Sequence, residues 1–272
     1  MTRRHPADPG GPSRRAVLGL AVLGLTAPVL AACGGSDGEV EVTSSVSGEL
    51  TRAWSDLAHR ALEQVEDLWG RGSVARPVRL VLPADPVGFT AATGVDAGRS
   101  DVPALVVDRG GQAQVVVHPR AWDRLTPQGR QAVLTHEVAH LAMQGDAGSG
   151  AGPVPGWLSE GLAEHTAHRD SDTPVVTVAG SALDGIRAGE VPQDWPDPLA
   201  GEGAKWGRYA LSWLACRYLA QQWGEPALME VYAEVAAGAD VASALRSVLG
   251  SSEPEVLAGW GQWLRELVAD EG

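Results

Sequence analysis

Two histidines and a glutamate near the middle of the chain have the residue types and spacing of a metal-binding site. Residues 136–140 read HEVAH, which is an HExxH motif. Residues four apart on an α-helix differ by about 400° of rotation and roughly 6 Å of rise, so His136 and His140 project from one face. Both imidazoles can then reach one Zn²⁺ ion, while Glu137 can face a water molecule on that ion.

The flanking residues favour a metal site over a chance match. A chance HExxH on a surface helix would leave its polar side chains in solvent. Here, no charged residue except Glu137 lies between Arg130 and Asp146. Burying two imidazoles and a carboxylate in such surroundings costs free energy unless a partner compensates. A bound cation would be that partner.

A catalytic zinc site needs a third protein ligand and an open position for water. Glu160 is the best candidate, because GWLSEGLAEH at residues 156–165 predicts a second helix. Glu164 lies one turn later on the same face, where it can accept a hydrogen bond from a ligand imidazole and fix its tautomer. Gly161 has no Cβ and predicts a close approach of this helix to the motif helix. The alternative for both glutamates is a solvated helix surface.

Three other residues are rival ligands. Asp146 lies six residues after the second histidine of the motif, where some zinc enzymes place their third ligand. Those motifs require a glycine at the position that Met143 occupies in this chain. His165 and His168 have no evident partner. Glu160 therefore stays the preferred third ligand, with Asp146 second.

The first 32 residues predict a removable export signal. A basic start is followed by the apolar run at residues 16–30, and small residues lead to Cys33, as is typical of secretory signals. Glycines and a proline interrupt the run, which is too short for a membrane-spanning helix. Residues 30–33, LAAC, resemble a bacterial lipobox, and residues 13–18 resemble a twin-arginine signal, with general secretion as the alternative. We therefore expect export and a lipid anchor at Cys33, on the outer face of the cytoplasmic membrane.

Charge and cysteine content limit which binding partners and disulfide bonds are expected. The formal net charge is −13, which argues against nucleic acid or an anionic membrane surface as a binding partner. The membrane contact that we expect is the lipid anchor alone. Cys216 is the one cysteine besides Cys33, so a lipidated Cys33 leaves no intrachain disulfide. Cys216 lies in an apolar helical pattern and is predicted to be a core residue. The sequence makes no prediction of oligomeric state.

The remaining pattern predicts a flexible tether at residues 33–48 and one α+β domain at residues 49–272. Periodicity predicts a helix at 49–69, strands at 77–83, 104–107 and 114–118 with a hairpin turn at 108–111, a loop at 85–101, and the motif helix at 126–144. After the helix that carries Glu160 come a strand-like run at 174–178, an irregular segment at 184–205, and helices at 206–223, 226–237, 241–249 and 254–268. A small N-terminal β-sheet thus precedes the motif helix, and the C-terminal part is mostly helical.

Together, HEVAH and WLSEGLAEH resemble the gluzincin clan of zinc metallopeptidases, in particular the bacterial peptidase-MA-like domains. The resemblance is motif-specific at residues 134–142 and 155–165. It implies a zincin-like metallopeptidase fold, with Zn²⁺ bound by His136, His140 and Glu160. In related enzymes a tyrosine or histidine of the helical part steadies the oxyanion, and Tyr209 stands where such domains often place a tyrosine.

The resemblance also implies an activity. It predicts that Glu137 is the general base in the hydrolysis of peptide bonds in an extracytoplasmic protein or peptide substrate. A rival from another class is a non-catalytic zinc-binding zincin-fold lipoprotein that acts as a binding or structural module. A third possibility, a structural domain with a chance motif, predicts no bound metal.

Overall fold

A computed structural model describes residues 38–98, 102–146, 153–198 and 205–270 of the 272-residue chain. The predicted signal at residues 1–32, the lipidation site Cys33 and the first part of the predicted tether lie outside these ranges. In the described ranges, no helix has the length and apolar character needed to cross a bilayer.

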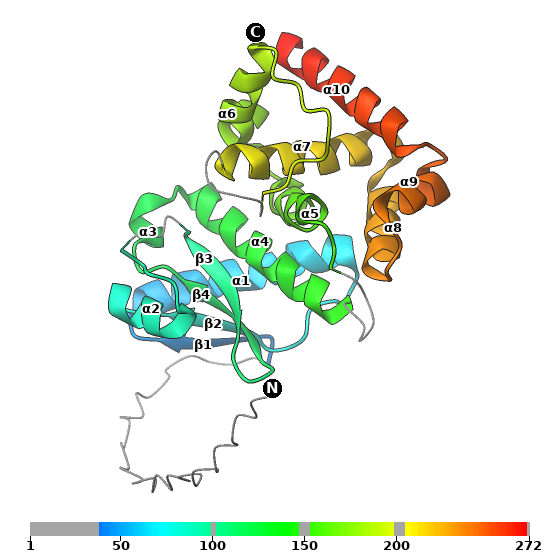
Figure 1. Ribbon diagram of the computed structural model, residues 1–272. Coiled ribbons are helices and arrows are strands. Elements are labelled where there is room, and N and C mark those ends of the chain that lie inside the picture. The colour runs from blue at the N-terminus through cyan, green and yellow to red at the C-terminus, as the bar shows by residue number, and fades with distance from the viewer. Residues whose placement is uncertain (1–37, 99–101, 147–152, 199–204, 271–272) are drawn as a thin grey trace, which may run out of the picture. The chain divides into compact units, whose positions relative to one another are not determined.

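The described part of the chain is α+β, with a small mixed sheet and many helices (Figure 1). The strands are β1 (Val40–Ser44), β2 (Val78–Leu82), β3 (Ala104–Asp108) and β4 (Ala113–Val117), in the order β1-β2-β4-β3. β1 pairs with β2 and β2 with β4 in parallel, whereas β3 and β4 form an antiparallel hairpin. The hairpin turn predicted at 108–111 is confirmed: Gly110 and Gly111 both have positive φ, and the Asp108 carboxylate accepts from the Gly111 N–H.

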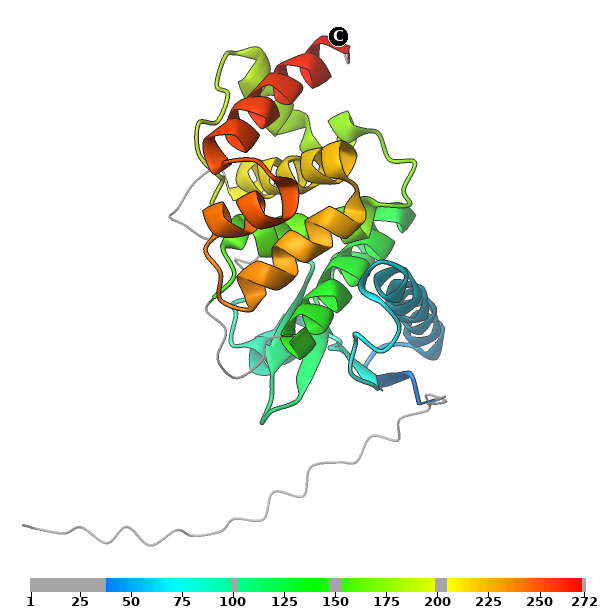
Figure 2. The same ribbon diagram turned by 90° about the vertical axis from the view of Figure 1, so that its right-hand side faces the viewer.

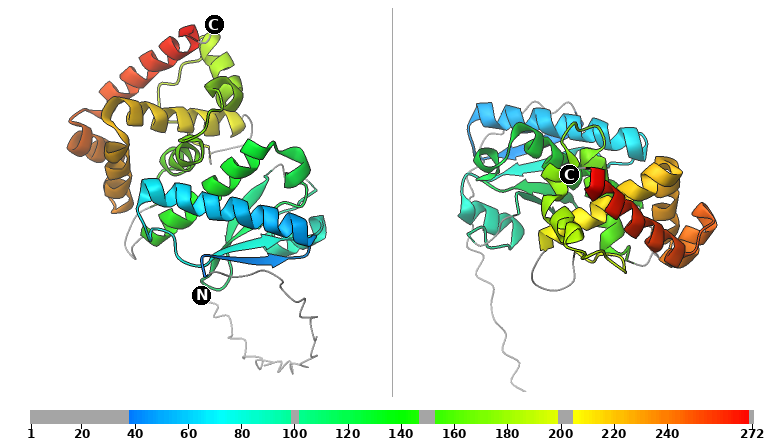
Figure 3. Two further views of the ribbon diagram at one scale, coloured as in Figure 1. Left: turned by 180° about the vertical axis from the view of Figure 1, so that it is seen from behind. Right: turned by 90° about the horizontal axis from the view of Figure 1, so that it is seen from above.

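The helices are α1 (Gly48–Trp69), α2 (Pro86–Thr93), α3 (Ala121–Arg124), α4 (Pro127–Asp146), α5 (Gly156–His168), α6 (Val175–Arg187), α7 (Lys205–Trp223), α8 (Glu225–Ala236), α9 (Val241–Leu249) and α10 (Glu253–Asp270). The motif helix α4 and the helix α5 were both predicted at close to these bounds. α1 lies beside α4, as the view from behind shows (Figure 3). α6 and α8 pack against α7, and α10 packs against α6 and α9 (Figure 2).

Alternate residues of the central strands enter two different cores, as the two-residue period of a strand requires. Leu80 and Val115 pack in the larger core with residues of α1 and α4. Val81 and Val116 belong instead to a smaller cluster that contains Phe89 of α2. Helices therefore cover both faces of the sheet, and β3 forms the edge next to α4.

The predicted tether at residues 33–48 is wrong in its second half. Val40 to Ser44 form β1, which pairs along its whole length with β2. Ser47 then caps α1 by accepting a hydrogen bond from the Leu50 N–H. Val40 is buried and Val42 is partly buried, so the alternation V-E-V-T was a strand signal that the sequence carried.

The predicted loop at 85–101 contains a helix. The Asp85 side chain caps α2 by accepting from the Gly88 N–H at 2.8 Å, Pro86 occupies the first turn, and Gly94 ends the helix in a left-handed conformation. Asp-Pro before a helix and glycine after it are known start and stop signals. The sequence therefore contained the information for α2.

The strand-like run at 174–178 is also wrong, because its valines begin α6. β-branched residues favour strands when they are considered locally. Here the apolar residues Val175, Ala179, Leu183 and Ile186 are buried on one helical face. Packing of that face decides the conformation.

The segment between α6 and α7, which was predicted to be irregular, contains Trp195. This residue stacks on two tryptophans, with ring centroids 4.1 Å from Trp157 and 5.7 Å from Trp260. Its indole N–H donates to Glu253 at 2.8 Å. This part of the segment is therefore held in the helical core.

Gly161 does permit a close approach, but to a different helix from the one predicted. A Cβ at Gly161 would overlap the Ser212 carbonyl and lie 2.8 Å from the Cys216 sulfur, both on α7. The role predicted for Gly161, a close approach to the motif helix, is therefore wrong, although α4 and α5 are in contact through other residues. Cys216 is buried in the core, as predicted.

Candidate metal centre

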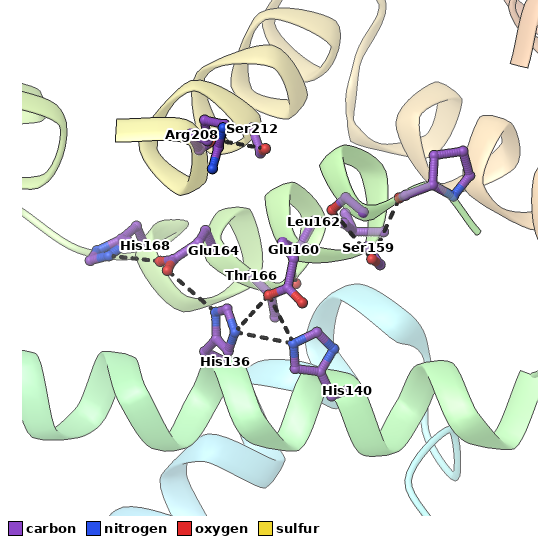
Figure 4. Close-up of polar contacts among 12 residues, drawn as sticks. His136, His140, Ser159, Glu160, Leu162, Glu164, Thr166, His168, Arg208 and Ser212 are labelled. Carbon is purple, nitrogen blue, oxygen red and sulfur yellow. Dashed lines mark hydrogen bonds and ion pairs between the residues drawn. The ribbon is translucent and has the colours of Figure 1, made fainter. Parts of the chain in front are cut away.

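α4 and α5 bring His136, His140 and Glu160 together (Figure 4). One oxygen of Glu160 lies 3.4 Å from His136 Nε2 and 3.3 Å from His140 Nε2, and the two Nε2 atoms are 3.1 Å apart. Of all His, Cys, Asp and Glu residues in the described ranges, these three are the one group placed to hold a metal ion. The grouping matches the ligand set expected from the motifs.

The size of this triangle suits a tetrahedral ion. Bonds of about 2.0–2.1 Å at tetrahedral angles separate neighbouring ligand atoms by about 3.3–3.4 Å. The three separations here are 3.1, 3.3 and 3.4 Å. Two imidazole nitrogens and a carboxylate oxygen suit Zn²⁺, and they also suit other divalent transition metals.

The negative charges around the triangle favour a bound cation. Burial raises the pKa of the Glu160 carboxyl, but hydrogen bonds and charge from His136 and His140 lower it to about 2. Burial disfavours the charged form of His136, yet Glu164, Glu160 and Glu137 together raise its pKa to about 9. In the absence of metal, the His136 imidazole is therefore positively charged at neutral pH. A bound metal ion would take the place of that positive charge.

Glu137 lies beside the triangle and is only 9% exposed. Burial raises the pKa of its carboxyl, although His136 and His140 act in the opposite direction. The carboxylate also accepts a hydrogen bond from the backbone N–H of Val106 on the edge strand β3. A carboxyl group with a raised pKa is a stronger base near neutral pH.

Glu164 lies next to His136, on the side away from the triangle, as predicted. Its Oε1 is 3.4 Å from His136 Nδ1, the nitrogen that points away from the triangle. Its other oxygen is 3.4 Å from His168 Nε2. We predicted no partner for His168, and that prediction is wrong. The i, i+4 spacing from Glu164 was the signal that could have found it.

Of the rival ligands, His165 and His168 do not join the triangle. His165 was also left without a partner, yet its Nε2 lies 3.2 Å from Glu225 Oε1, on α8. Arg169 donates to the same carboxylate at 2.9 Å. Asp146 is the last residue of α4, and its side chain lies outside what the structure describes.

Tyr209 of α7 lines the site together with His136 and Glu137. Burial raises the pKa of its phenol, and the charges of Glu160, Glu137 and Glu164 raise it further. The phenol therefore stays protonated at neutral pH and can donate a hydrogen bond.

Two hollows meet at the candidate centre. Both are lined by His136, Glu137 and Tyr209, and by residues 102 and 104 beside β3. The first, of about 580 Å³, continues along the N-terminal half of α4 towards α6. The second, of about 840 Å³, continues along the C-terminal half of α4 towards α8. Because these walls come from segments far apart in sequence, no local pattern predicted them.

No protein-family model matches the sequence, and no curated protein matches it either.

Proposed function

We propose that the protein is a zinc-dependent metallopeptidase that hydrolyses peptide bonds of an extracytoplasmic protein or peptide. The observation that carries the proposal is the triangle of His136, His140 and Glu160 with tetrahedral separations, beside the buried carboxylate of Glu137. The resemblance of the two motifs to the gluzincins supports the same reading, and with it a zincin-like fold.

Each residue has a role in this reaction. His136, His140 and Glu160 would hold a zinc ion, which would supply a Lewis acid able to lower the pKa of water to about 7. Glu137 accepts the proton of the attacking water and passes it to the leaving amine. Glu164 lies 3.4 Å from His136 Nδ1, outside hydrogen-bond geometry. With the ion bound it would accept the Nδ1–H and leave the Nε2 lone pair for the metal. Tyr209 donates a hydrogen bond to the developing oxyanion.

The shape of the site favours a chain as substrate over a small molecule. The two hollows extend from Glu137 in opposite directions along α4, and β3 is the edge strand beside both. An extended peptide can therefore place residues on either side of the scissile bond. We further propose that the lipid anchor at Cys33 holds the enzyme on the outer face of the cytoplasmic membrane.

One observation favours a non-catalytic alternative. The Glu137 carboxylate accepts a hydrogen bond from the Val106 N–H, so part of its capacity is engaged by the backbone. If this bond persists with zinc and substrate bound, Glu137 is less free to move protons. The protein would then be a zinc-binding lipoprotein that recognises a partner without cleaving it.

The variant Glu137→Gln separates the two functions. The peptidase proposal predicts that it keeps about one zinc per chain but loses chelator-sensitive hydrolysis of casein by about 100-fold or more, because general-base catalysis typically contributes that much. Full activity in this variant would refute the proposed mechanism. Zinc binding by a wild type that cleaves neither casein nor a peptide library would favour the binding module.

A further inference from the structure

α5 carries Glu160, Glu164 and His168 at intervals of four residues, which places them in a row along one helical face. Figure 4 shows this row facing the histidines of α4. Glu160 belongs to the candidate metal triangle, whereas the other two residues lie beyond it. The row ends at His168, the last residue of α5.

The two oxygens of Glu164 face two different imidazoles. Oε1 lies 3.4 Å from His136 Nδ1, and Oε2 lies 3.4 Å from His168 Nε2. A largely buried carboxylate is costly unless both oxygens have partners.

His168 is oriented towards Glu164 and has little else to bind. Its side chain is 15% exposed, and its ring packs at 5.4 Å from that of Trp213 on α7. Its Nδ1 is buried and has no hydrogen-bond partner in the described part of the chain. Packing thus fixes the ring, and its Nε2 atom, which faces Glu164, makes the polar contact of this side chain.

We propose that His168 is a positioning residue for the metal site: it holds the Glu164 carboxylate in line with His136 Nδ1 and so aims His136 Nε2 at the metal. The proposal rests on the proposed function only in that the triangle must bind zinc. It does not require that the protein cleaves anything.

Loss of His168 should lower zinc affinity because the Glu164 carboxylate can then rotate. Without His168, the oxygen that faces it loses its partner, and the carboxylate is free to turn away from His136. His136 then loses the acceptor that fixes its tautomer and ring orientation. Loss of such an outer partner typically lowers metal affinity about 10–100-fold.

The test measures Zn²⁺ affinity of the full-length chain by competition with a chelator. His168→Leu should weaken binding about 10-fold or more. His168→Gln keeps an N–H donor with similar reach and should remain within about three-fold of wild type. In a Glu164→Ala background, His168→Leu should have no further effect, because no carboxylate remains to be positioned.

His165→Leu is the matched control. It removes a histidine from the same helix whose partner is Glu225 rather than Glu164, so zinc affinity should not change. Thermal unfolding in EDTA checks that each variant folds. If His168→Leu unfolds, His168→Asn gives the same test, because its shorter side chain cannot reach Glu164.

Several results would overturn the proposal. Wild-type affinity in His168→Leu is one, and an equal loss in the Glu164→Ala background is another. A second zinc per chain that disappears with His168 would make it a ligand instead. If the wild type binds no zinc, the proposed function fails together with this inference. If zinc binds but no peptide is cleaved, the proposed function fails alone.

Discussion

The crossing of α5 and α7 gives the sharpest prediction about stability. A Cβ at Gly161 would lie less than 3.0 Å from three atoms, namely the carbonyl oxygen and carbon of Ser212 and the sulfur of Cys216. Two of these atoms are backbone and cannot rotate away. Gly161→Ala must therefore push the two helices apart, and α5 carries Glu160.

The magnitude follows from two opposing effects. Overpacking a core by one methyl group costs about 1–3 kcal/mol, and the rigid backbone contact places this site at the upper end. Alanine recovers up to about 1 kcal/mol through its higher helix propensity. We expect a net loss of about 2 kcal/mol in the free energy of unfolding, together with weaker zinc binding.

Gly180→Ala on α6 is the matched control. A Cβ at this helical glycine meets no atom within 4 Å. It should stabilise the protein by about 0.4–1 kcal/mol, since only the conformational terms remain. Urea unfolding of both variants in EDTA measures the two effects without the metal. Equal or greater stability of Gly161→Ala relative to wild type would refute the reasoning about this crossing.

Four further predictions concern the site and the anchor. Because zinc must displace a proton from His136, whose pKa is about 9, zinc affinity should rise about tenfold per pH unit between pH 7 and pH 9; a flat profile in chelator-buffered titrations would contradict this. Without metal, stability should change with pH in the opposite direction to zinc affinity. Because the pKa of His136 is raised from 6.5, its contribution to stability is complete below pH 6.5 and is lost as pH rises through about 9. Unfolding in EDTA at several pH values measures this loss. Tyr209→Phe should lower kcat about 10-fold or more while zinc content stays constant, and an unchanged kcat would remove Tyr209 from the mechanism. Cys33→Ser should move the protein from the membrane fraction to the soluble fraction, whereas retention in the membrane would argue against a lipid anchor.

The candidate site was largely predictable because its key relations are local. HExxH places two histidines on one helical face, and the spacing between Glu160 and Glu164 does the same on the next helix. Once the two helices are in contact, few arrangements of these side chains remain. His168 follows the same spacing rule, and it was missed because it was considered only as a ligand.

Relations between distant segments were not predictable from the sequence. The partner of Gly161 depends on where α7 crosses, and the contact between Glu137 and Val106 depends on which strand lies at the sheet edge. The helix α6 was misassigned because packing of its apolar face outweighs local β-propensity, whereas the alternation of Val40 and Val42 was an overlooked strand signal for β1. The helix α2 was overlooked in the same way, although Asp85, Pro86 and Gly94 carried its start and stop signals.

The central claim is that zinc held by His136, His140 and Glu160 makes this protein a peptidase. The most direct test measures zinc per chain and cleavage of a peptide library in the same samples of wild type and Glu160→Ala. The account predicts about one zinc per chain and chelator-sensitive cleavage in the wild type, with both lost in the variant. Cleavage that persists in Glu160→Ala without bound zinc would contradict it.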